Sequence, residues 1–367
     1  MYIFNPEHDL CLANGDIHFV PPESAIAFGR DCASLTQFFR GLDEDTDIGM
    51  HPDTIENQKE KIEGKETKKI VPWGWNFVLR NQLLKKGFDE RLLASADEIE
   101  NICKLSHRKT ALMGLEFLHY EGFANSNNQI KILPSTYRIG AKSVDEVELF
   151  LKHNPHIVLK APLSGSGKGI RFVTGDLSHS DKGWCKNLIE RHNCVVAEQR
   201  FTPIMEFAML FKSTIEGEIS FLGYSLFTAQ NGAYRGNILA SNEHILKTLT
   251  QIIDLRMIDN TRKGLEKFLS QQTKGKYEGF IGVDQFICTN YPPHSDNSEA
   301  DREIFYNPLV EINFRMTMGV VARNIYDNFA TNLNIADGSH IFEICRSKQN
   351  GKTSYSYHFR PLQLSRI

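Results

Sequence analysis

The alternation of apolar and polar positions divides the chain into an α/β N-terminal stretch and a longer α+β remainder. A short apolar run at residues 2–4 ends at Asn5-Pro6, and residues 68–87 show a strand-like segment followed by an amphipathic helix. A second unit begins near Ser106, where apolar residues recur at helical spacing. Ser143, with Glu146 three positions later, is typical of a capping box and predicts a helix from residue 144.

Two strand-like segments, 156–162 and 170–175, enclose the glycine-rich residues 163–169, so the glycines connect strand to strand. From Val195 onward, hairpins predominate. Strands are expected at 195–201, 206–215, 218–228, 233–239, 279–290 and 303–315, with turns at Glu216-Gly217 and Asn231-Gly232. Helices are expected around 244–255 and 261–272. The order of elements predicts an α+β fold without internal repeats.

Composition supports a globular protein of two or three units. The 367 residues are 41% hydrophobic and 24% charged, which excludes collagenous, disordered and coiled-coil classes. The net charge of −3 lacks the basic excess of nucleic-acid or anionic-membrane binders, so neither partner is expected. Seven scattered cysteines without a C-x-x-C pair indicate reduced thiols. With no signal-like N-terminus and no apolar run of about 18 residues, we expect a cytoplasmic location.

The glycine-rich loop has two interpretations. Ser164, Gly165, Ser166, Gly167, Lys168 and Gly169 fit neither a Walker A loop nor a dinucleotide-binding loop, because Pro162 replaces the first glycine and a strand follows. A flexible surface hairpin is the simpler interpretation. A flap over a nucleotide is the other, and Lys160 at the end of the preceding strand favours it, because its ammonium can reach phosphates.

Two strands carry a set of oxygen-bearing side chains. Glu311, Asn313 and Arg315 alternate along one strand and therefore share a face, and Asp284 lies on the preceding strand. Each residue alone is typical of a solvent-exposed strand position. If the strands pair, however, Asp284 approaches Glu311, and facing carboxylates in apolar surroundings indicate a cation between them. Asp, Glu and Asn are ligands suited to Mg²⁺.

The motif order over about residues 106 to 325 resembles the ATP-grasp superfamily, and most of all its carboxylate-amine ligases such as D-alanine:D-alanine ligase and biotin carboxylase. The series is VLKAPLSGSGKGIRFV, VVAEQRF, MEFAML, GVDQFI and EINFR. The resemblance implies an N-terminal α/β domain (1–105) and two α+β subdomains that grip ATP. These are a small lid subdomain (106–205) and a large subdomain with the metal site (206–367).

The resemblance also implies roles for individual residues. Lys160 would contact the ATP phosphates beneath the 164–169 flap, with Arg108 and Lys109 both candidates for a further contact. Glu198 and the backbone of Gln199, Arg200 and Phe201 would border the adenine, and Glu206 would bind the ribose. Asp284, Glu311 and Asn313 would hold two Mg²⁺ ions, with Mn²⁺ as a substitute. Arg315 and Arg235 would act on the transferred phosphate.

The leading hypothesis is an ATP- and Mg²⁺-dependent ligase for small molecules. It would activate a carboxylate as an acyl phosphate, which an amine or similar nucleophile then attacks. The alternatives are a kinase that phosphorylates a hydroxyl group and a non-catalytic ATP-binding regulatory module. In the N-terminal unit, Asn5, His8, Trp73 and Trp75 follow predicted strands and are candidates for substrate contacts. A capped turn and a tryptophan core are the alternative interpretations of these four residues.

Overall fold

The computed structural model describes residues 1–42, 49–50, 52, 69–123, 130–164, 169–230, 233–290, 303–349 and 351–362. Four residues of the predicted flap, Gly165 to Lys168, lie outside this range, as does the predicted Asn231-Gly232 turn. No helix in the described part of the chain combines the length and apolar character that crossing a membrane requires.

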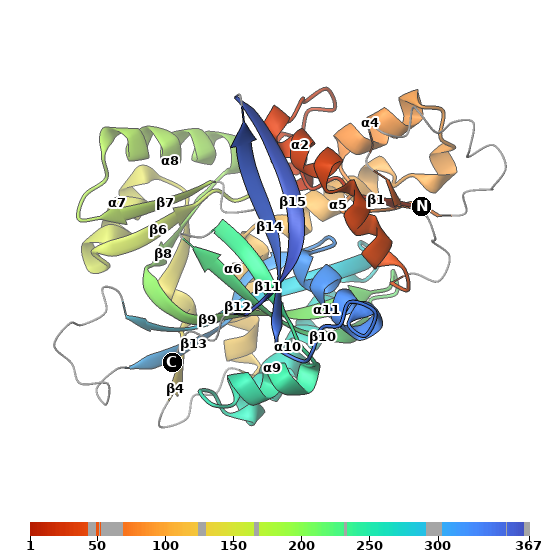
Figure 1. Ribbon diagram of the computed structural model, residues 1–367. Helices are drawn as coiled ribbons and strands as arrows, with labels where there is room; N and C mark the ends of the chain where they lie inside the picture. The colour runs from red at the N-terminus through yellow and green to blue at the C-terminus, as the bar shows by residue number, and fades with distance from the viewer. Residues whose placement is uncertain are drawn as a thin grey trace.

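The N-terminal part is a small parallel sheet with surrounding helices (Figure 1). Its strand order is β2-β1-β3, with β1 Tyr2–Ile3, β2 Gly49–Met50 and β3 Val71–Pro72. The helical segments are α1 His8–Asn14, α2 Glu23–Asp31, the 3-10 segment η1 Ala33–Phe39, α4 Phe77–Lys85, the 3-10 segment η3 Glu90–Leu92, and α5 Ala96–Ser106. Asn76 caps α4 by accepting a hydrogen bond from the amide of Leu79.

A second, four-stranded antiparallel sheet has the order β5-β8-β6-β7. Its strands are β5 Arg138–Ala141, β6 His156–Lys160, β7 Ile170–Thr174 and β8 Val195–Gln199. Figure 1 shows helices α7 (Val144–His153) and α8 (His179–His192) packed beside it. Alternate strand residues such as Ile157 and Ala197 join these helices in a core, so the other face of the sheet remains for polar side chains.

The largest element is an eight-stranded sheet of order β15-β14-β11-β10-β9-β12-β13-β4. Its strands are β4 Ile130–Ile132, β9 Phe201–Ser213, β10 Ile219–Gln230, β11 Ala233–Leu239, β12 Gly279–Asn290, β13 Ile304–Asn313, β14 His340–Gln349 and β15 Lys352–Pro361. The remaining helical segments are α6 Lys109–Tyr120, the 3-10 segment η4 Ser135–Tyr137, α9 Asn242–Leu249, α10 Leu255–Thr273 and α11 Met318–Phe329.

Apolar residues cover both faces of this sheet, because successive strand residues point in opposite directions. Phe207 and Met209 pack with α6, α9 and α10 in one core. Ala208 and Leu210 pack on the opposite face with α11 and the N-terminal part. Asp284 lies directly opposite Ala208 in the β9–β12 register, so its carboxylate projects on the α11 face. The fold therefore carries this side chain toward the N-terminal part of the chain.

The predicted α+β class is confirmed, and several local predictions are confirmed with it. Ser143 caps α7 by accepting a hydrogen bond from the amide of Glu146, although Glu146 reaches back to the amide of Lys142 rather than to Ser143. Strands β6 and β7 pair around the glycine loop, and β9 and β10 form the hairpin expected across Glu216-Gly217. The helix expected from Ser106 begins later, at Lys109, because Ser106 is the last residue of α5.

Candidate active site

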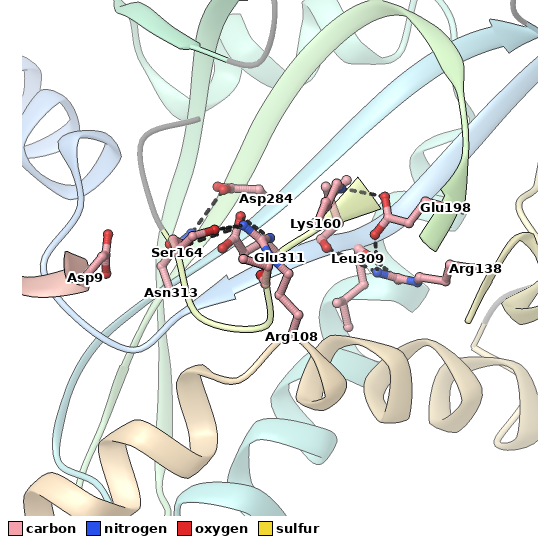
Figure 2. A network of polar contacts seen from close by, with 12 residues as sticks. Asp9, Arg108, Arg138, Lys160, Ser164, Glu198, Asp284, Leu309, Glu311 and Asn313 are labelled. Carbon is pink, nitrogen blue, oxygen red and sulfur yellow. Dashed lines mark hydrogen bonds and ion pairs between the residues drawn. The ribbon is translucent and has the colours of Figure 1, made fainter. Parts of the chain in front are cut away.

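The centre of the candidate site is a pair of carboxylates on neighbouring strands. Asp284 and Glu311 are direct cross-strand partners in β12 and β13, so their side chains share one face. The side-chain amide of Asn313 donates a hydrogen bond of 3.0 Å to Asp284 Oδ2 (Figure 2). Burial and the nearby Glu311 raise the pKa of Asp284 to about 7. Negative charge at this position is therefore incompletely balanced by the protein.

Arg108 connects Glu311 to the segment that enters the glycine loop. Its guanidinium lies 2.8 Å from Glu311 Oε2 and donates hydrogen bonds to the carbonyl of Ala161 (2.8 Å) and the hydroxyl of Ser164 (3.1 Å). The side chain is buried, whereas Lys109 is exposed. Of the two candidates for a phosphate-contacting cation, the structure thus brings Arg108 to the carboxylates.

A buried ion cluster lies on the four-stranded sheet, on the face opposite helices α7 and α8. Lys160 and Arg138 both pair with Glu198, at 2.5 Å and 3.6 Å respectively, and all three residues are buried (Figure 2). Burial alone would raise the pKa of Glu198, but Lys160 and Arg138 outweigh it and hold this pKa below its ordinary value. Glu198 therefore remains ionised and holds the Lys160 ammonium in place.

Arg138 is a component of the site that the sequence analysis missed. Its guanidinium donates hydrogen bonds to the carbonyls of Leu309 and Val310, immediately before Glu311 in β13. It thereby joins the small sheet to the strand that carries the candidate metal ligands. The sequence feature that could have identified Arg138 is its position in RIGA, a short strand whose other residues are small or apolar.

Replacing Arg138 with lysine is expected to lower the free energy of unfolding by about 1–3 kcal/mol, because a single ammonium cannot reproduce the planar contacts with two carbonyls and Glu198. Urea unfolding measures this loss. Arg171→Lys is a matched control on the same sheet, because the Arg171–Asp181 pair is partly exposed. Equal losses in the two variants would refute a special role for Arg138.

Arg315 connects this site to the N-terminal part of the chain. Its Nε donates to Asp9 Oδ1 at 2.8 Å, Nη2 to Asn313 Oδ1 at 2.9 Å, and Nη1 to the carbonyl of Met316 at 3.1 Å. The amide of Met316 in turn donates to the carbonyl of Trp73. Burial opposes ionisation of Asp9, but Arg315 outweighs it, and the pKa of Asp9 is lowered. Asp9 is thus a carboxylate held ionised against a guanidinium.

The N-terminal candidates named from the sequence lie in or against the packed interior. His8 is buried, with its pKa lowered to about 4, mainly by burial, so its ring is neutral at pH 7. Asn5 is buried and donates to the carbonyl of Gly74. Trp73 packs against Phe4 in the core. Trp75 is partly buried against the core. Their predicted contacts with substrate stay predictions.

A methyl group at Gly74 is expected to disturb α1, because a Cβ there would lie 2.6 Å from three ring atoms of His8. Gly74→Ala should lower the free energy of unfolding by about 1–3 kcal/mol in urea titrations. Gly183→Ala is the control, since a Cβ within α8 would meet no atom within 4 Å and should stabilise that helix by up to about 1 kcal/mol. A Gly74→Ala protein as stable as wild type would contradict this packing.

Side chains from α1, the end of α5, the start of the glycine loop and residues 311–315 line one small cleft. Its residues are Asp9, Leu12, Ser106, Leu163, Ser164, Glu311, Ile312, Asn313, Phe314 and Arg315. Within the described residues, no group of three or more His, Cys, Asp or Glu side chains is arranged to hold a metal ion. The candidate ligand set contains two carboxylates and the amide of Asn313. Metal binding is therefore a proposal based on the type and charge of these side chains.

The predicted nucleotide contacts fall on two sides of strand β8. Glu198 faces Lys160, whereas Gln199 is paired with Ile157 and belongs to the opposite face. Gln199 and Phe201 line a separate cavity of about 270 Å³. The guanidinium of Arg200 lies over the ring of Phe172. The adenine contacts, which were predicted for the backbone of this segment, stay predictions.

Two further predicted residues lie on the large sheet. Glu206 shares the face of Asp284, since it precedes Ala208 by two positions, and it accepts a hydrogen bond of 3.1 Å from the amide of Ala229. Burial raises the pKa of Glu206. Arg235 is exposed at a bulge of β11 and does not line the small cleft. The structure thus places Glu206 on the carboxylate-bearing face, whereas Arg235 is exposed at the bulge.

Comparison with known proteins gives structural matches alone. No protein-family model matches the chain, and no curated protein matches it. A biotin carboxylase from Campylobacter jejuni is similar with a TM-score of 0.43, 12% identity, and coverage of 80% of this chain and 62% of that protein. An N5-carboxyaminoimidazole synthetase from Staphylococcus aureus, complexed with ADP, has a TM-score of 0.42, 13% identity, and coverage of 95% and 82%.

An ATP-grasp superfamily protein from Archaeoglobus fulgidus has a TM-score of 0.43, 12% identity, and coverage of 99% of both chains. These similar structures are ATP-grasp proteins, as the motif order predicted. The chain spans less than two thirds of the length of the biotin carboxylase. Likenesses at these identities and TM-scores carry no conclusion about the reaction, which has to be inferred from the side chains.

Proposed function

We propose that the protein is an ATP- and Mg²⁺-dependent ligase that activates a small-molecule carboxylate as an acyl phosphate for attack by an amine or similar nucleophile. The observation that carries the proposal is the adjacency of Asp284 and Glu311 on paired strands, with the Arg108 guanidinium against Glu311 and the Arg315 guanidinium joined to Asp284 through Asn313. Facing carboxylates repel one another, and a divalent cation removes that repulsion.

The residues present fit Mg²⁺. Asp284, Glu311 and Asn313 offer oxygen ligands, and the raised pKa of Asp284 indicates a need for additional positive charge. Bound with ATP, Mg²⁺ would supply electrostatic stabilisation of the phosphate oxygens. Mn²⁺ would substitute for it, because both ions take oxygen ligands.

Four basic residues have complementary tasks in this proposal. Lys160 and Arg108 would neutralise the ATP phosphates, and Glu198 would hold Lys160 until the nucleotide arrives. Arg315 would neutralise charge that develops on the transferred phosphoryl group and on the carboxylate that accepts it. Arg235 is exposed on β11, so its contact with the phosphates would require a movement of β11 toward the bound nucleotide. No side-chain nucleophile is required, since the carboxylate of the substrate attacks the γ-phosphorus.

Under the proposed domain limits, all three domains contribute residues to the site. Arg108, Lys160 and Glu198 belong to the lid subdomain (106–205), and the carboxylates and Arg315 to the large subdomain (206–367). Glu206 would bind the ribose at the junction, on the face that carries Asp284. The N-terminal domain (1–105) would adjoin the acceptor, because its Asp9 lines the same cleft.

Incubation with ATP, Mg²⁺ and pooled carboxylates and amines tests the proposed reaction. ADP and phosphate should form together with a condensed product, and omission of either the carboxylate or the amine pool should abolish that product. A phosphorylated hydroxyl compound would instead identify a kinase. Nucleotide binding without any turnover would identify a binding module and contradict the ligase proposal.

A further inference from the structure

The N-terminal part of the chain contributes a charged side chain to the interior of the candidate site. Helix α1 places Asp9 in the small cleft, 2.8 Å from Arg315 and 306 residues away from it in the sequence. The Asp9 and Arg315 side chains are 20% and 13% exposed, so water screens this ion pair only weakly.

From Asp9, a continuous series of polar contacts leads to the candidate metal ligands. Arg315 Nη2 donates to Asn313 Oδ1 at 2.9 Å, and Asn313 Nδ2 donates to Asp284 Oδ2 at 3.0 Å. This pattern determines which way the Asn313 amide faces, because its oxygen must meet the guanidinium and its nitrogen the carboxylate. The orientation of one ligand thus depends on the position of Arg315.

The guanidinium of Arg315 is itself held on three sides. Nε, Nη1 and Nη2 each donate to a different partner, so three of the five N–H donors of an arginine are used. The Met316 carbonyl and Asn313 both belong to the chain segment of Arg315. Asp9 is the one partner of the three that comes from another part of the fold, and the one that carries a negative charge.

We propose that Asp9 is a positioning residue, which orients Arg315 and through it the Asn313 and Asp284 ligands, so that the N-terminal domain completes the metal–nucleotide site. The inference rests on the proposed function. Residues that orient metal ligands without touching the metal commonly change metal affinity 10- to 100-fold. Asp9 acts through one further side chain, and we expect an effect of about 10-fold.

The test is a titration of the full chain with Mn²⁺ in the presence of saturating ADP. Electron paramagnetic resonance measures the free Mn²⁺ at each point. Asp9→Asn keeps the volume and one acceptor oxygen but removes the charge, and should weaken Mn²⁺ binding about 10-fold. Asp16→Asn is the matched control, because Asp16 is exposed just beyond α1, and its Mn²⁺ affinity should equal that of wild type. Asp9→Glu should recover part of the affinity.

A second background separates positioning from a general structural effect. In Arg315→Met, Asp9→Asn should cause no further loss of Mn²⁺ affinity, because the group through which Asp9 acts is absent. Additive losses, or equal affinities in Asp9→Asn and wild type, would overturn the inference while leaving the proposed function intact. Failure of the wild-type protein to bind Mn²⁺ with ADP would overturn both. If Asp9→Asn does not fold by thermal melting, Asp9→Ser provides the same comparison.

Discussion

Asp284→Asn is expected to reduce Mg²⁺-dependent turnover about 10²- to 10³-fold and, at the same time, to stabilise the ligand-free protein. Turnover falls because the variant removes the charge of a metal ligand from the site where phosphoryl charge is neutralised. Stability rises because the native protein holds the Asp284 carboxylate in an unfavourable environment, as its pKa of about 7 indicates. Lower turnover together with higher stability is the result expected when a residue serves function at a cost in stability.

The stability effect has a definite pH dependence. The pKa of Asp284 is higher in the folded protein than its ordinary value of 3.8, so the folded state binds the proton more tightly than the unfolded state. Wild-type stability therefore decreases as the pH rises from about 4 to about 7, and the contribution is constant above that range. Above pH 7, the free energy of unfolding of Asp284→Asn should exceed that of wild type by on the order of 1–3 kcal/mol in urea titrations. The gain is smaller than the full pKa shift implies, because Asp284 is half-buried and water screens its charge.

Glu311→Gln is the matched control for this prediction. It should also reduce turnover strongly, but it removes the partner of the buried Arg108 guanidinium and should therefore destabilise the protein. Two neighbouring carboxylates are thus expected to change stability in opposite directions. Unchanged turnover in both variants would contradict the metal assignment, and a destabilised Asp284→Asn protein would contradict the charge argument.

Lys160→Met is expected to weaken ATP binding at least about 10-fold and to lower the free energy of unfolding by about 2–4 kcal/mol. The binding loss follows from removal of a phosphate-contacting ammonium. The stability loss follows because Glu198 is buried and would have Arg138 as its remaining cation. Calorimetric titration with ATP and urea unfolding measure the two effects.

The double variant Lys160→Met/Glu198→Gln separates these roles. Removing the anion together with its cation should recover much of the lost stability, whereas ATP binding should remain weak. Glu198→Gln alone should be destabilising, because Lys160 and Arg138 would then be buried together without an anion. Recovery of ATP affinity in the double variant would show that Lys160 serves only to balance Glu198.

The elements that carry the site could be predicted from the sequence where local patterns determine them. Strict alternation in EINFR predicted the face shared by Glu311 and Asn313, and the strand that contains GVDQFI pairs with it so that Asp284 lies opposite Glu311. The Ser143 cap and the glycine-linked β6–β7 hairpin follow from equally local chemistry. The C-terminal hairpin of β14 and edge strand β15 was not predicted, because apolar residues alternate in β15 alone and both strands are rich in polar residues.

Contacts between distant segments could not be predicted in this way. The pairing of Asp9 with Arg315 depends on how the N-terminal part packs against α11 and the large sheet. Arg138 presents the same difficulty, because its partners are backbone carbonyls of β13. Hydrogen bonds to main-chain atoms leave no sequence motif, so tertiary packing alone reveals them.

The most direct test of the account is calorimetric titration of the wild-type protein with a non-hydrolysable ATP analogue, with and without Mg²⁺, alongside Asp284→Asn and Glu311→Gln. Mg²⁺ should tighten binding to the wild-type protein, and each substitution should remove most of this enhancement. Binding of equal strength with and without Mg²⁺ in all three proteins would contradict a metal–nucleotide site at these carboxylates.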